Sequence, residues 1–333
     1  MKFPRQSVVF SGVRQVDFQK AEVELSPSKT GILFAPSYSC VSAGTELAKL
    51  TGLQKVDFPL CLGNRAVGRV IEVGEGHTLV KKGDLILAHA AHTSIAAYDG
   101  FCGKLPEEAD RPEAALLGMG LVALTGAQQV AAQVGDTAVV TGAGLVGNLT
   151  AQLLKLSGAR VIIVDQVPER LAVAKACGIP HCVSGTPEEI TRQVLDLTDG
   201  IGAEFGLECT GVPAVVRGLP AMLARRGHMV MVGSPRGESG DMTAFLNSFH
   251  LWQPHGDLTL SGAHEWKIPP YPTPFVKHSM ARNLGILCRL MIEEKLLLTP
   301  LTQIFAPSHA AEAYKKLEAE KNTTLGVVFD WTR

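Results

Sequence analysis

The stretch VVTGAGLVGN restricts the possible folds of this chain more than any other. Its glycines at positions 142, 144 and 147 form the pattern G-x-G-x-x-G. A chain with 34 glycines contains such patterns by chance, so the flanking residues decide its meaning. An apolar run typical of a buried strand precedes the glycines, and a segment with helical spacing of apolar residues follows them. A second apolar run, VIIVD, ends in Asp165, 18 residues after Gly147. Together these features predict a nucleotide-binding strand–helix–strand unit.

Each part of this unit has a physical role in binding a dinucleotide. Gly142 permits the tight turn, Gly144 lets the backbone approach a pyrophosphate, and Gly147 lets the helix pack against the strand. The helix N-terminus offers unpaired N–H groups to the phosphates. Asp165 accepts hydrogen bonds from the adenosine ribose and repels a 2′-phosphate, which favours NAD(H) over NADP(H). The alternative is a turn of another doubly wound protein, with Asp165 as a solvated residue at a strand end.

The rest of the sequence divides into three regions. Residues 1 to about 110 contain β-branched runs separated by Gly and Pro, which predicts an irregular, mostly β domain. From Gly135 to about residue 267, strands and helices alternate, which predicts a parallel sheet with helices on both faces. After residue 267 come two helical segments and a final strand. This last region either caps the α/β domain or returns to the first one.

The composition excludes several classes of function. The net charge is −1 with no basic block, so a nucleic-acid partner is not expected. The N-terminus lacks the apolar core of a secretory signal, and no run of about 18 apolar residues predicts a membrane-spanning helix. The seven cysteines are scattered and form no C-x-x-C pair. This pattern is typical of reduced thiols in a cytoplasmic protein, and we expect a small-molecule partner.

The order of these regions, with GAGLVG, IIVD, ECTG and MVGS in sequence, resembles the medium-chain dehydrogenase/reductase superfamily. The resemblance covers nearly the whole chain and implies an α/β fold with two domains. Residues 1–122 and 268–333 are expected to form a GroES-like, β-rich catalytic domain. Residues 123–267 are expected to form a Rossmann domain with a doubly wound parallel sheet that binds NAD. The implied cofactor-binding residues are Gly142, Gly144, Leu145, Val146, Gly147, Asp165, Cys209, Thr210, Val232, Gly233 and Ser234.

The positions that hold zinc in many members of this superfamily are changed here. The zinc members carry Cys-Gly-Thr-Asp where this chain reads Ala-Gly-Thr-Glu at 43–46, and Gly-His-Glu where it reads Gly-Asn-Arg at 63–65. The third ligand position corresponds to Met119, and the structural zinc lobe keeps one cysteine, Cys102. Alanine has no donor atom, and Asn and Met are poor ligands of Zn²⁺. We therefore expect a zinc-lacking branch with no bound metal.

Other side chains must then handle the substrate oxygen. The resemblance implies catalytic roles for Thr45, which keeps the proton-relaying hydroxyl, for Glu46 beside it, and for Arg65, a cation near the former metal position. The alternatives are that Thr45 caps a helix and that Glu46 and Arg65 form a structural ion pair. The expected substrate-binding residues are Asn64, Met119 and His264.

Three functions remain open at this point. The leading hypothesis is a zinc-independent, NAD(H)-dependent oxidoreductase that moves a hydride between nicotinamide and a secondary alcohol or ketone, such as a sugar or polyol. An enone or quinone reductase is the first rival, although Asp165 disfavours the NADPH that such enzymes commonly use. A non-catalytic NAD(H)-binding redox sensor is the second. By analogy we also expect a homodimer, formed at the edge of the Rossmann sheet near the segment LTLSGAH.

Overall fold

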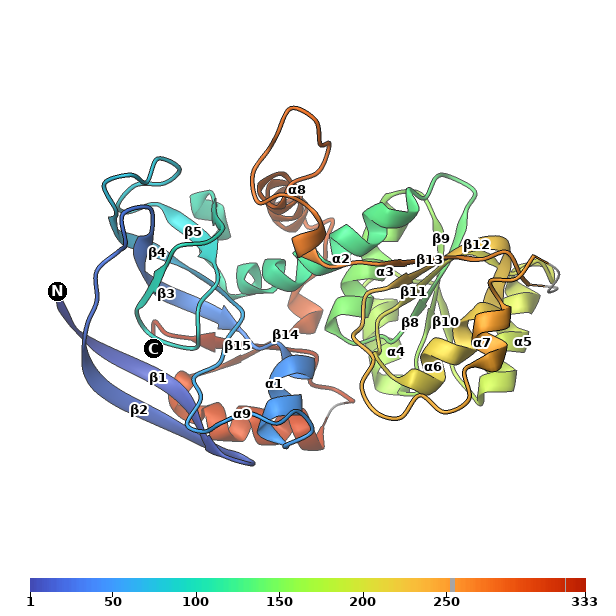
Figure 1. The fold of residues 1–333 in the computed structure, drawn as a ribbon, viewed down its shortest axis with the longest axis horizontal. Coiled ribbons are helices and arrows are strands. Elements are labelled where there is room, and N and C mark those ends of the chain that lie inside the picture. The colour runs from blue at the N-terminus through green and yellow to red at the C-terminus, as the bar shows by residue number, and fades with distance from the viewer. Residues whose placement is uncertain (252–254, 321) are drawn as a thin grey trace. The chain divides into compact units, whose positions relative to one another are not determined.

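The computed structural model describes residues 1–251, 255–320 and 322–333. Within these residues the chain forms two compact units (Figure 1). Unit 1 contains Met1–Gly118 and Pro269–Arg333, and unit 2 contains Met119–Ile268. None of the helices in the described ranges has the length and apolar character that a bilayer crossing requires.

Unit 1 is built on a seven-stranded sheet whose order is β14-β15-β3-β4-β5-β7, with β6 paired to β3. Strands β14 and β15 are parallel, and the other pairs are antiparallel. A separate antiparallel hairpin consists of β1 and β2. The bounds of the strands are β1 (Lys2–Gly12), β2 (Gln15–Glu24), β3 (Ile32–Cys40), β4 (Arg65–Val73), β5 (Leu85–Ala88), β6 (Ala96–Tyr98), β7 (Cys102–Lys104), β14 (Thr302–Phe305) and β15 (Gly326–Asp330).

The last strand decides where the C-terminal region belongs. Strand β15 pairs antiparallel with β3 (Figure 1). In this register Val328 lies opposite Cys40. The C-terminal residues therefore return to the first, β-rich region, which was one of the two possibilities left open by the sequence. Helix α8 (Met280–Ile292) also belongs to unit 1, and Ser279 caps it by accepting a hydrogen bond from the Arg282 N–H.

Two further helices of unit 1 position polar groups that are described below. Helix α9 (Ala310–Ala319) has buried residues at spacings of three and four, which places them on one face. On that face, Tyr314 packs edge-on against Phe10, with 5.0 Å between ring centroids. Helix α1 (Ala43–Leu50) contributes Leu50 to the same apolar cluster. The core thus fixes α1 and α9 against the hairpin and the sheet.

Unit 2 is a six-stranded sheet of order β10-β9-β8-β11-β12-β13, and all its strands are parallel. The chain runs outward from β8 in one direction and then from β11 in the other, so the strand order reverses between these two strands. The expected doubly wound sheet is thereby confirmed. The strands are β8 (Thr137–Thr141), β9 (Arg160–Val164), β10 (His181–Val183), β11 (Ala203–Glu208), β12 (Leu223–Met231) and β13 (Thr259–Gly262).

Several helices of unit 2 begin with a proline in the first turn. For example, Thr186 and Glu189 form a capping box at the start of α5, with Pro187 as its first residue. Helix α2 starts in unit 1 and continues into unit 2. The bounds are α2 (Leu117–Val130), α3 (Leu145–Leu156), α4 (Pro168–Ala176), α5 (Pro187–Leu197), α6 (Pro213–Gly218) and α7 (Thr243–Asn247).

Candidate functional site

The glycine-rich turn connects β8 to α3 at the point where the strand order reverses. Gly142 has φ +93°, a backbone conformation that favours glycine. A Cβ on Gly147 would lie 1.7 Å from the Gly142 carbonyl oxygen, so the helix packs directly on the turn. A Cβ on Gly144 would meet no atom within 4 Å, so this side of the turn is open. Gly144 is also the N-cap of α3, and Leu145 and Val146 form its first turn.

A cavity of about 1140 Å³ lies in unit 2 next to this turn. Five of the predicted cofactor residues line it, at the carboxyl ends of β8, β9 and β11: Gly142, Gly144, Asp165, Cys209 and Thr210. Its far wall is formed by residues that the sequence analysis did not single out, among them Arg170 on α4, Thr191, Arg192 and Leu195 on α5, and Val215 on α6. A mostly apolar cleft with a few polar groups at a switch point is the usual position of a nucleotide site in such sheets.

Asp165 is held more firmly than a solvated residue at a strand end. Its Oδ2 accepts a hydrogen bond of 2.7 Å from the Ala143 N–H, and its Oδ1 accepts one of 2.9 Å from the Val167 N–H. Arg170 Nη1 lies 3.5 Å from Asp165 Oδ2, and the Asp165 side chain is 8% exposed. The carboxylate thus ties the glycine-rich turn to the end of β9, and it is paired with a cation.

A second turn of the cavity wall is organised by Glu208, which the sequence analysis did not select. Its fully buried carboxylate accepts hydrogen bonds from the hydroxyl and N–H of Thr210 and from the Gly211 N–H. Its carbonyl oxygen accepts from the N–H groups of Val232 and Gly233. Glu208 therefore holds the ECTG and VGS segments side by side. The signal in the sequence was an acid at the last position of a strand, directly before the cysteine of the ECTG motif.

The cysteine in this turn is not a nucleophile in this environment. Burial, and after it the charge of Glu208, raises the pKa of the Cys209 thiol far above its ordinary value. A hydrogen bond to Thr150 Oγ1 opposes this shift but does not offset it. The thiol stays protonated and serves as a small apolar part of the cavity wall.

In unit 1, the segment that starts at Val41 forms helix α1, and its first turn contains two of the predicted catalytic residues. The N-cap is Ser42, so Thr45 does not cap this helix. Thr45 is exposed, and within the described residues its hydroxyl has no hydrogen-bond partner in the protein. Glu46, the next residue, is 2% exposed and accepts a 2.7 Å hydrogen bond at Oε1 from the Ser42 N–H. The two neighbours thus face opposite environments.

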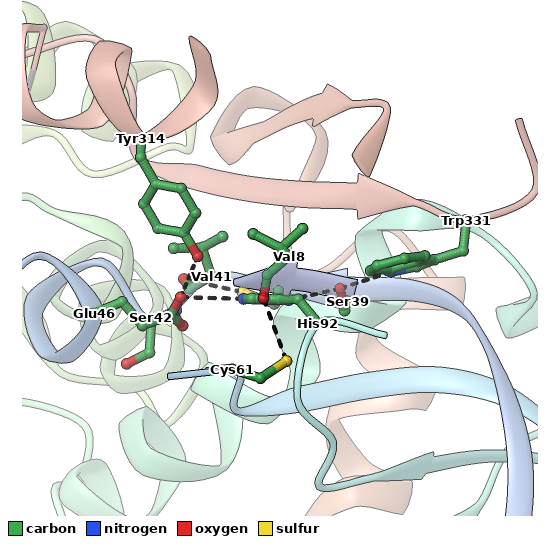
Figure 2. Close-up of polar contacts among 10 residues, drawn as sticks. Val8, Ser39, Val41, Ser42, Glu46, Cys61, His92, Tyr314 and Trp331 are labelled. Carbon is green, nitrogen blue, oxygen red and sulfur yellow. Dashed lines mark hydrogen bonds and ion pairs between the residues drawn. The ribbon is translucent and has the colours of Figure 1, made fainter. Parts of the chain in front are cut away.

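Figure 2 shows the network around Glu46, which joins α1 to α9 and to the loop after β5. His92 Nε2 lies 3.1 Å from Glu46 Oε2, and the Tyr314 hydroxyl donates to the same oxygen. On the other side of the ring, His92 Nδ1 lies 2.8 Å from Ser39 Oγ, which accepts from Trp331 Nε1 at 2.9 Å. An indole N–H can only donate. The Ser39 hydroxyl is then free to donate to His92, whose Nε2–H donates to Glu46.

The ionisation of this network follows from its surroundings. Burial by itself raises the pKa of Glu46, but the neighbouring His92 and the hydrogen bonds from His92, Tyr314 and Ser42 outweigh burial and hold that pKa below its ordinary value. Burial and the Glu46 charge raise the pKa of Tyr314 well above its ordinary value. The carboxylate is therefore ionised and the phenol protonated near neutral pH.

The order Ser39–His92–Glu46 is that of a nucleophile, a base and an acid in many hydrolases. Here the three side chains are between 0% and 2% exposed. Ser39 Oγ also accepts the Trp331 N–H. A substrate carbonyl has no access to this hydroxyl, so the network connects elements of the fold and is not a hydrolytic triad. It also buries Glu46, for which a catalytic role was expected beside Thr45.

Arg65 lies at the start of β4 and is 2% exposed. Its Nη1 lies 3.2 Å from Asn64 O, from Asn64 Oδ1 and from His89 Nδ1. A Cβ on Gly118 would lie 2.2 Å from Arg65 Cγ, so this glycine leaves room for the arginine stem. The suggested ion pair between Glu46 and Arg65 is wrong, because the Glu46 carboxylate is bonded to Ser42, His92 and Tyr314.

The two other predicted substrate-binding residues belong to unit 2. Met119 lies in α2 and is 6% exposed. His264 precedes the short 3-10 helix Glu265–Lys267, and its side chain is 51% exposed. Its ring stacks on Trp266, and its Nδ1 lies 3.0 Å from Glu265 Oε2. Neither residue lines the cofactor cavity.

The residues at the zinc-ligand positions do not fit a metal ion. Ala43 presents a methyl group, and the Asn64 side-chain oxygen already accepts from the Arg65 guanidinium. A divalent cation beside Asn64 would lie next to a permanent positive charge. Among the residues that the structure describes, no group of three or more His, Cys, Asp or Glu side chains is arranged to hold a metal.

Comparisons with known proteins agree with this architecture. The family model "Alcohol dehydrogenase GroES-like domain" matches residues 39–143, and "Zinc-binding dehydrogenase" matches residues 146–276. A sorbitol dehydrogenase of Halalkalibacterium halodurans is 29% identical, over 63% of this chain and 71% of the relative. An (R,R)-butanediol dehydrogenase of Bacillus subtilis is 30% identical, over 48% of this chain and 54% of the relative.

Solved structures support the same fold. A quinone oxidoreductase of Pseudomonas syringae superposes with a TM-score of 0.79 and 21% identity, over 98% of this chain and 99% of that one. The two family models meet at the glycine-rich turn and together match most of the chain. With its GroES-like and Rossmann parts, the chain belongs to the medium-chain dehydrogenase/reductase superfamily.

Proposed function

We propose that this protein is a cytoplasmic, NAD(H)-dependent oxidoreductase that moves a hydride between nicotinamide and a small secondary alcohol or ketone, without a catalytic zinc. The observation that carries the proposal is the cavity beside the glycine-rich turn, with Gly144 open and α3 pointing its N-terminus at it. The names of the relatives, sorbitol and butanediol dehydrogenases, suggest a polyol or sugar as substrate. All seven cysteines are free, which favours the cytoplasm.

In unit 2, the residues around the cavity bind and orient the cofactor. When NAD is bound, its nicotinamide accepts or supplies the hydride. The N–H groups at the start of α3 bind the pyrophosphate, and the open side of Gly144 gives it room. Asp165 still has acceptor positions for a ribose hydroxyl, because a carboxylate can accept about four hydrogen bonds. Glu208 keeps the ECTG and VGS turns in place.

In unit 1, the proposed chemistry uses Thr45 and Arg65. Oxidation of an alcohol requires its proton to leave and its developing negative charge to be stabilised. The exposed Thr45 hydroxyl is available to pass on that proton. The Arg65 guanidinium supplies positive charge where zinc relatives have a metal. Glu46 acts through Thr45, since its buried hydrogen bonds fix the first turn of α1.

Two other functions are separated from this one by a single assay. An enone or quinone reductase spreads the charge over a conjugated system and needs less help at the oxygen, and one solved relative of this fold is a quinone oxidoreductase. A redox sensor binds NADH and turns over nothing. NADH absorbance followed with panels of polyols, ketones and enones distinguishes the three, and we expect turnover with a polyol or its ketone.

NADH is expected to bind more tightly than NADPH, because Asp165 accepts from a ribose hydroxyl and repels a 2′-phosphate. Fluorescence titration of the purified protein with both reduced cofactors measures the ratio of their dissociation constants. Equal affinities, or tighter binding of NADPH, contradict the proposed cofactor.

The protein is expected to hold no stoichiometric zinc, since Ala43 and Asn64 do not fit the metal. Elemental analysis of protein that was purified without chelators and with zinc in the medium is the test. One zinc per chain, lost when Asn64 is replaced by alanine, would overturn the zinc-free proposal.

We also propose a homodimer through β13, which is the edge strand of the unit 2 sheet. Leu260 on this strand is 46% exposed, and an exposed apolar side chain on an edge strand is consistent with a second copy of the chain covering that edge. Light scattering that shows a monomer at micromolar concentration removes this proposal.

A further inference from the structure

An exposed loop of unit 1 leads into helix α8 and projects beyond it (Figure 1). This segment, residues 270–277, is called the tip loop. Its Phe275 is 96% exposed, and the neighbouring Val276 is 46% exposed. Among the residues that the structure describes, no other large apolar side chain is as exposed as Phe275. Single exposed apolar residues are common on protein surfaces, but here two neighbours lie at one turn.

The tip loop is fixed to the sheet of unit 1 at its base. The Tyr271 hydroxyl accepts a hydrogen bond from the Cys102 N–H and donates one to the Cys102 carbonyl oxygen, each at 3.2 Å. The Tyr271 ring packs against Phe101, with 5.5 Å between ring centroids. Four of the residues 269–274 are prolines, which restrict the backbone. The apolar tip is therefore presented on a braced loop, which lowers the entropic cost of contact with a partner.

The exposed charges beside the tip are all positive along this part of the chain. Residues 268–292 contain Lys277, Arg282 and Arg289 and no Asp or Glu. Both arginines are exposed, and their spacing of seven residues places them on one face of α8. Arg282 Nη1 lies 3.2 Å from His278 Nδ1, which connects this face of the helix to the base of the loop. Acidic side chains begin only after the end of α8. An apolar tip and a basic stripe thus adjoin each other.

We propose that the tip loop and the basic face of α8 form a peripheral docking surface for an anionic lipid bilayer. Phe275 and Val276 enter the headgroup region, and Lys277, Arg282 and Arg289 contact the anionic headgroups. Contact of this kind lies on the bilayer surface and requires no spanning helix. The proposal goes beyond hydride transfer and does not depend on it.

A second copy of the chain fits this surface less well. A two-fold contact through it would place identical cations opposite each other. A specific protein interface also buries about 800 Å² on each partner. An aromatic side chain such as Phe275 supplies only about 150–250 Å². A bilayer needs no more than shallow insertion of the apolar tip and attraction between headgroups and cations.

The test is co-sedimentation of the full chain with vesicles of phosphatidylcholine alone, and of equal parts of phosphatidylcholine and phosphatidylglycerol. We expect binding to the anionic vesicles only, weakened at high ionic strength, where the charges are screened. Phe275→Ser should lower the partition coefficient about tenfold or more, the effect of no longer burying an aromatic side chain. Lys277→Gln and Arg289→Gln should each lower it about fivefold, the effect of one cation near an anionic surface.

Matched variants elsewhere on the surface serve as controls. Val134→Ser removes an apolar side chain that is 90% exposed but belongs to unit 2. Lys315→Gln removes an exposed cation of α9. Both should keep the partition coefficient of the wild type. Phe275→Trp places a reporter at the tip, and its emission should shift to shorter wavelengths with anionic vesicles, a shift that the wild type lacks. Thermal melting verifies that each variant is folded.

Several outcomes overturn the proposal. A wild type that binds neither kind of vesicle, or binds both equally, rules out an anionic bilayer as the partner. If Phe275→Ser binds anionic vesicles as the wild type does, a different surface makes the contact. Light scattering of the same proteins tests the remaining occupant. A dimer that Phe275→Ser dissociates shows that a second copy of the chain covers the tip, which also contradicts the proposal.

Discussion

Replacement of Glu46 by alanine is expected to lower the free energy of unfolding by about 3–5 kcal/mol, because three buried donors lose their acceptor at about 1–3 kcal/mol each. The change leaves His92 Nε2, the Tyr314 hydroxyl and the Ser42 N–H without their shared acceptor. Glu46 is 2% exposed, so water does not replace it. Urea unfolding followed by circular dichroism measures the loss.

Two control variants show whether the network accounts for that loss. Tyr314→Phe keeps the ring but removes one donor to the carboxylate, and should cost about 1.5–3 kcal/mol. Thr45→Ala lies on the same helix at an exposed position, and should change stability by less than about 0.5 kcal/mol. A loss below about 1 kcal/mol in Glu46→Ala would show that the network contributes little.

The same network predicts how stability depends on pH. In the folded protein the pKa of Glu46 lies below its ordinary value. A group with a lowered folded-state pKa contributes stability that is fully present above its unfolded pKa, about 4.3, and is lost as the pH falls through the folded value. Unfolding measured from pH 7 down to pH 3 should therefore show a decline in the wild type below about pH 4.3 that Glu46→Ala lacks.

The parts of the fold that depend on neighbouring residues could be predicted from the sequence. The strand–turn–helix at Gly142, the alternation of strands and helices, and the capping box at Thr186 are all set by residues a few positions apart. Local spacing also placed Asp165 beside the glycine-rich turn, because a parallel strand next to β8 must end there. The positions of the family motifs were sufficient to identify the substitutions at the zinc-ligand positions.

Side-chain partners far apart in sequence could not be predicted in the same way. The acid at position 46 pairs with His92 and Tyr314, which lie 46 and 268 residues later in the chain. The sequence showed an acid and a cation in neighbouring motifs, and the proximity suggested a pair with Arg65 that does not form. Strand register explains the difference, because Arg65 begins β4 opposite Cys40. From this position its guanidinium contacts Asn64 and His89 and not Glu46.

Arg170 and Glu208 carry local sequence signals, but they were not selected as candidate site residues. Arg170 follows Asp165 by five residues, at the start of a helix, where its side chain can turn back toward the strand end. Glu208 is the last residue of β11 and precedes the ECTG cysteine, and a buried acid there requires several donors. Both roles depend on which backbone N–H groups and charges converge at the switch point, and only the folded sheet brings them together.

Replacement of Thr45 by alanine is expected to lower turnover about 100-fold or more, the usual effect of losing a proton-transfer group. The affinity for NADH should not change, because Thr45 is not among the residues that line the cofactor cavity. The measurement uses the secondary alcohol or ketone with the highest turnover in the panel, with NADH binding titrated in parallel. Thr45→Ser is the matched control, since it keeps the hydroxyl, and should retain turnover within a few-fold.

The expected pattern separates a proton relay from a structural role. Thr45 is exposed and its hydroxyl has no protein partner within the described residues, so Thr45→Ala should melt at the wild-type temperature while it loses activity. Glu46→Ala should lose stability first, because Glu46 is bonded to the buried His92 and Tyr314. Its remaining folded fraction should also show reduced turnover, since the first turn of α1 is then no longer fixed. Full activity of Thr45→Ala on the best substrate would refute the relay, and the enone-reductase hypothesis, which needs less help at the oxygen, would become the leading one.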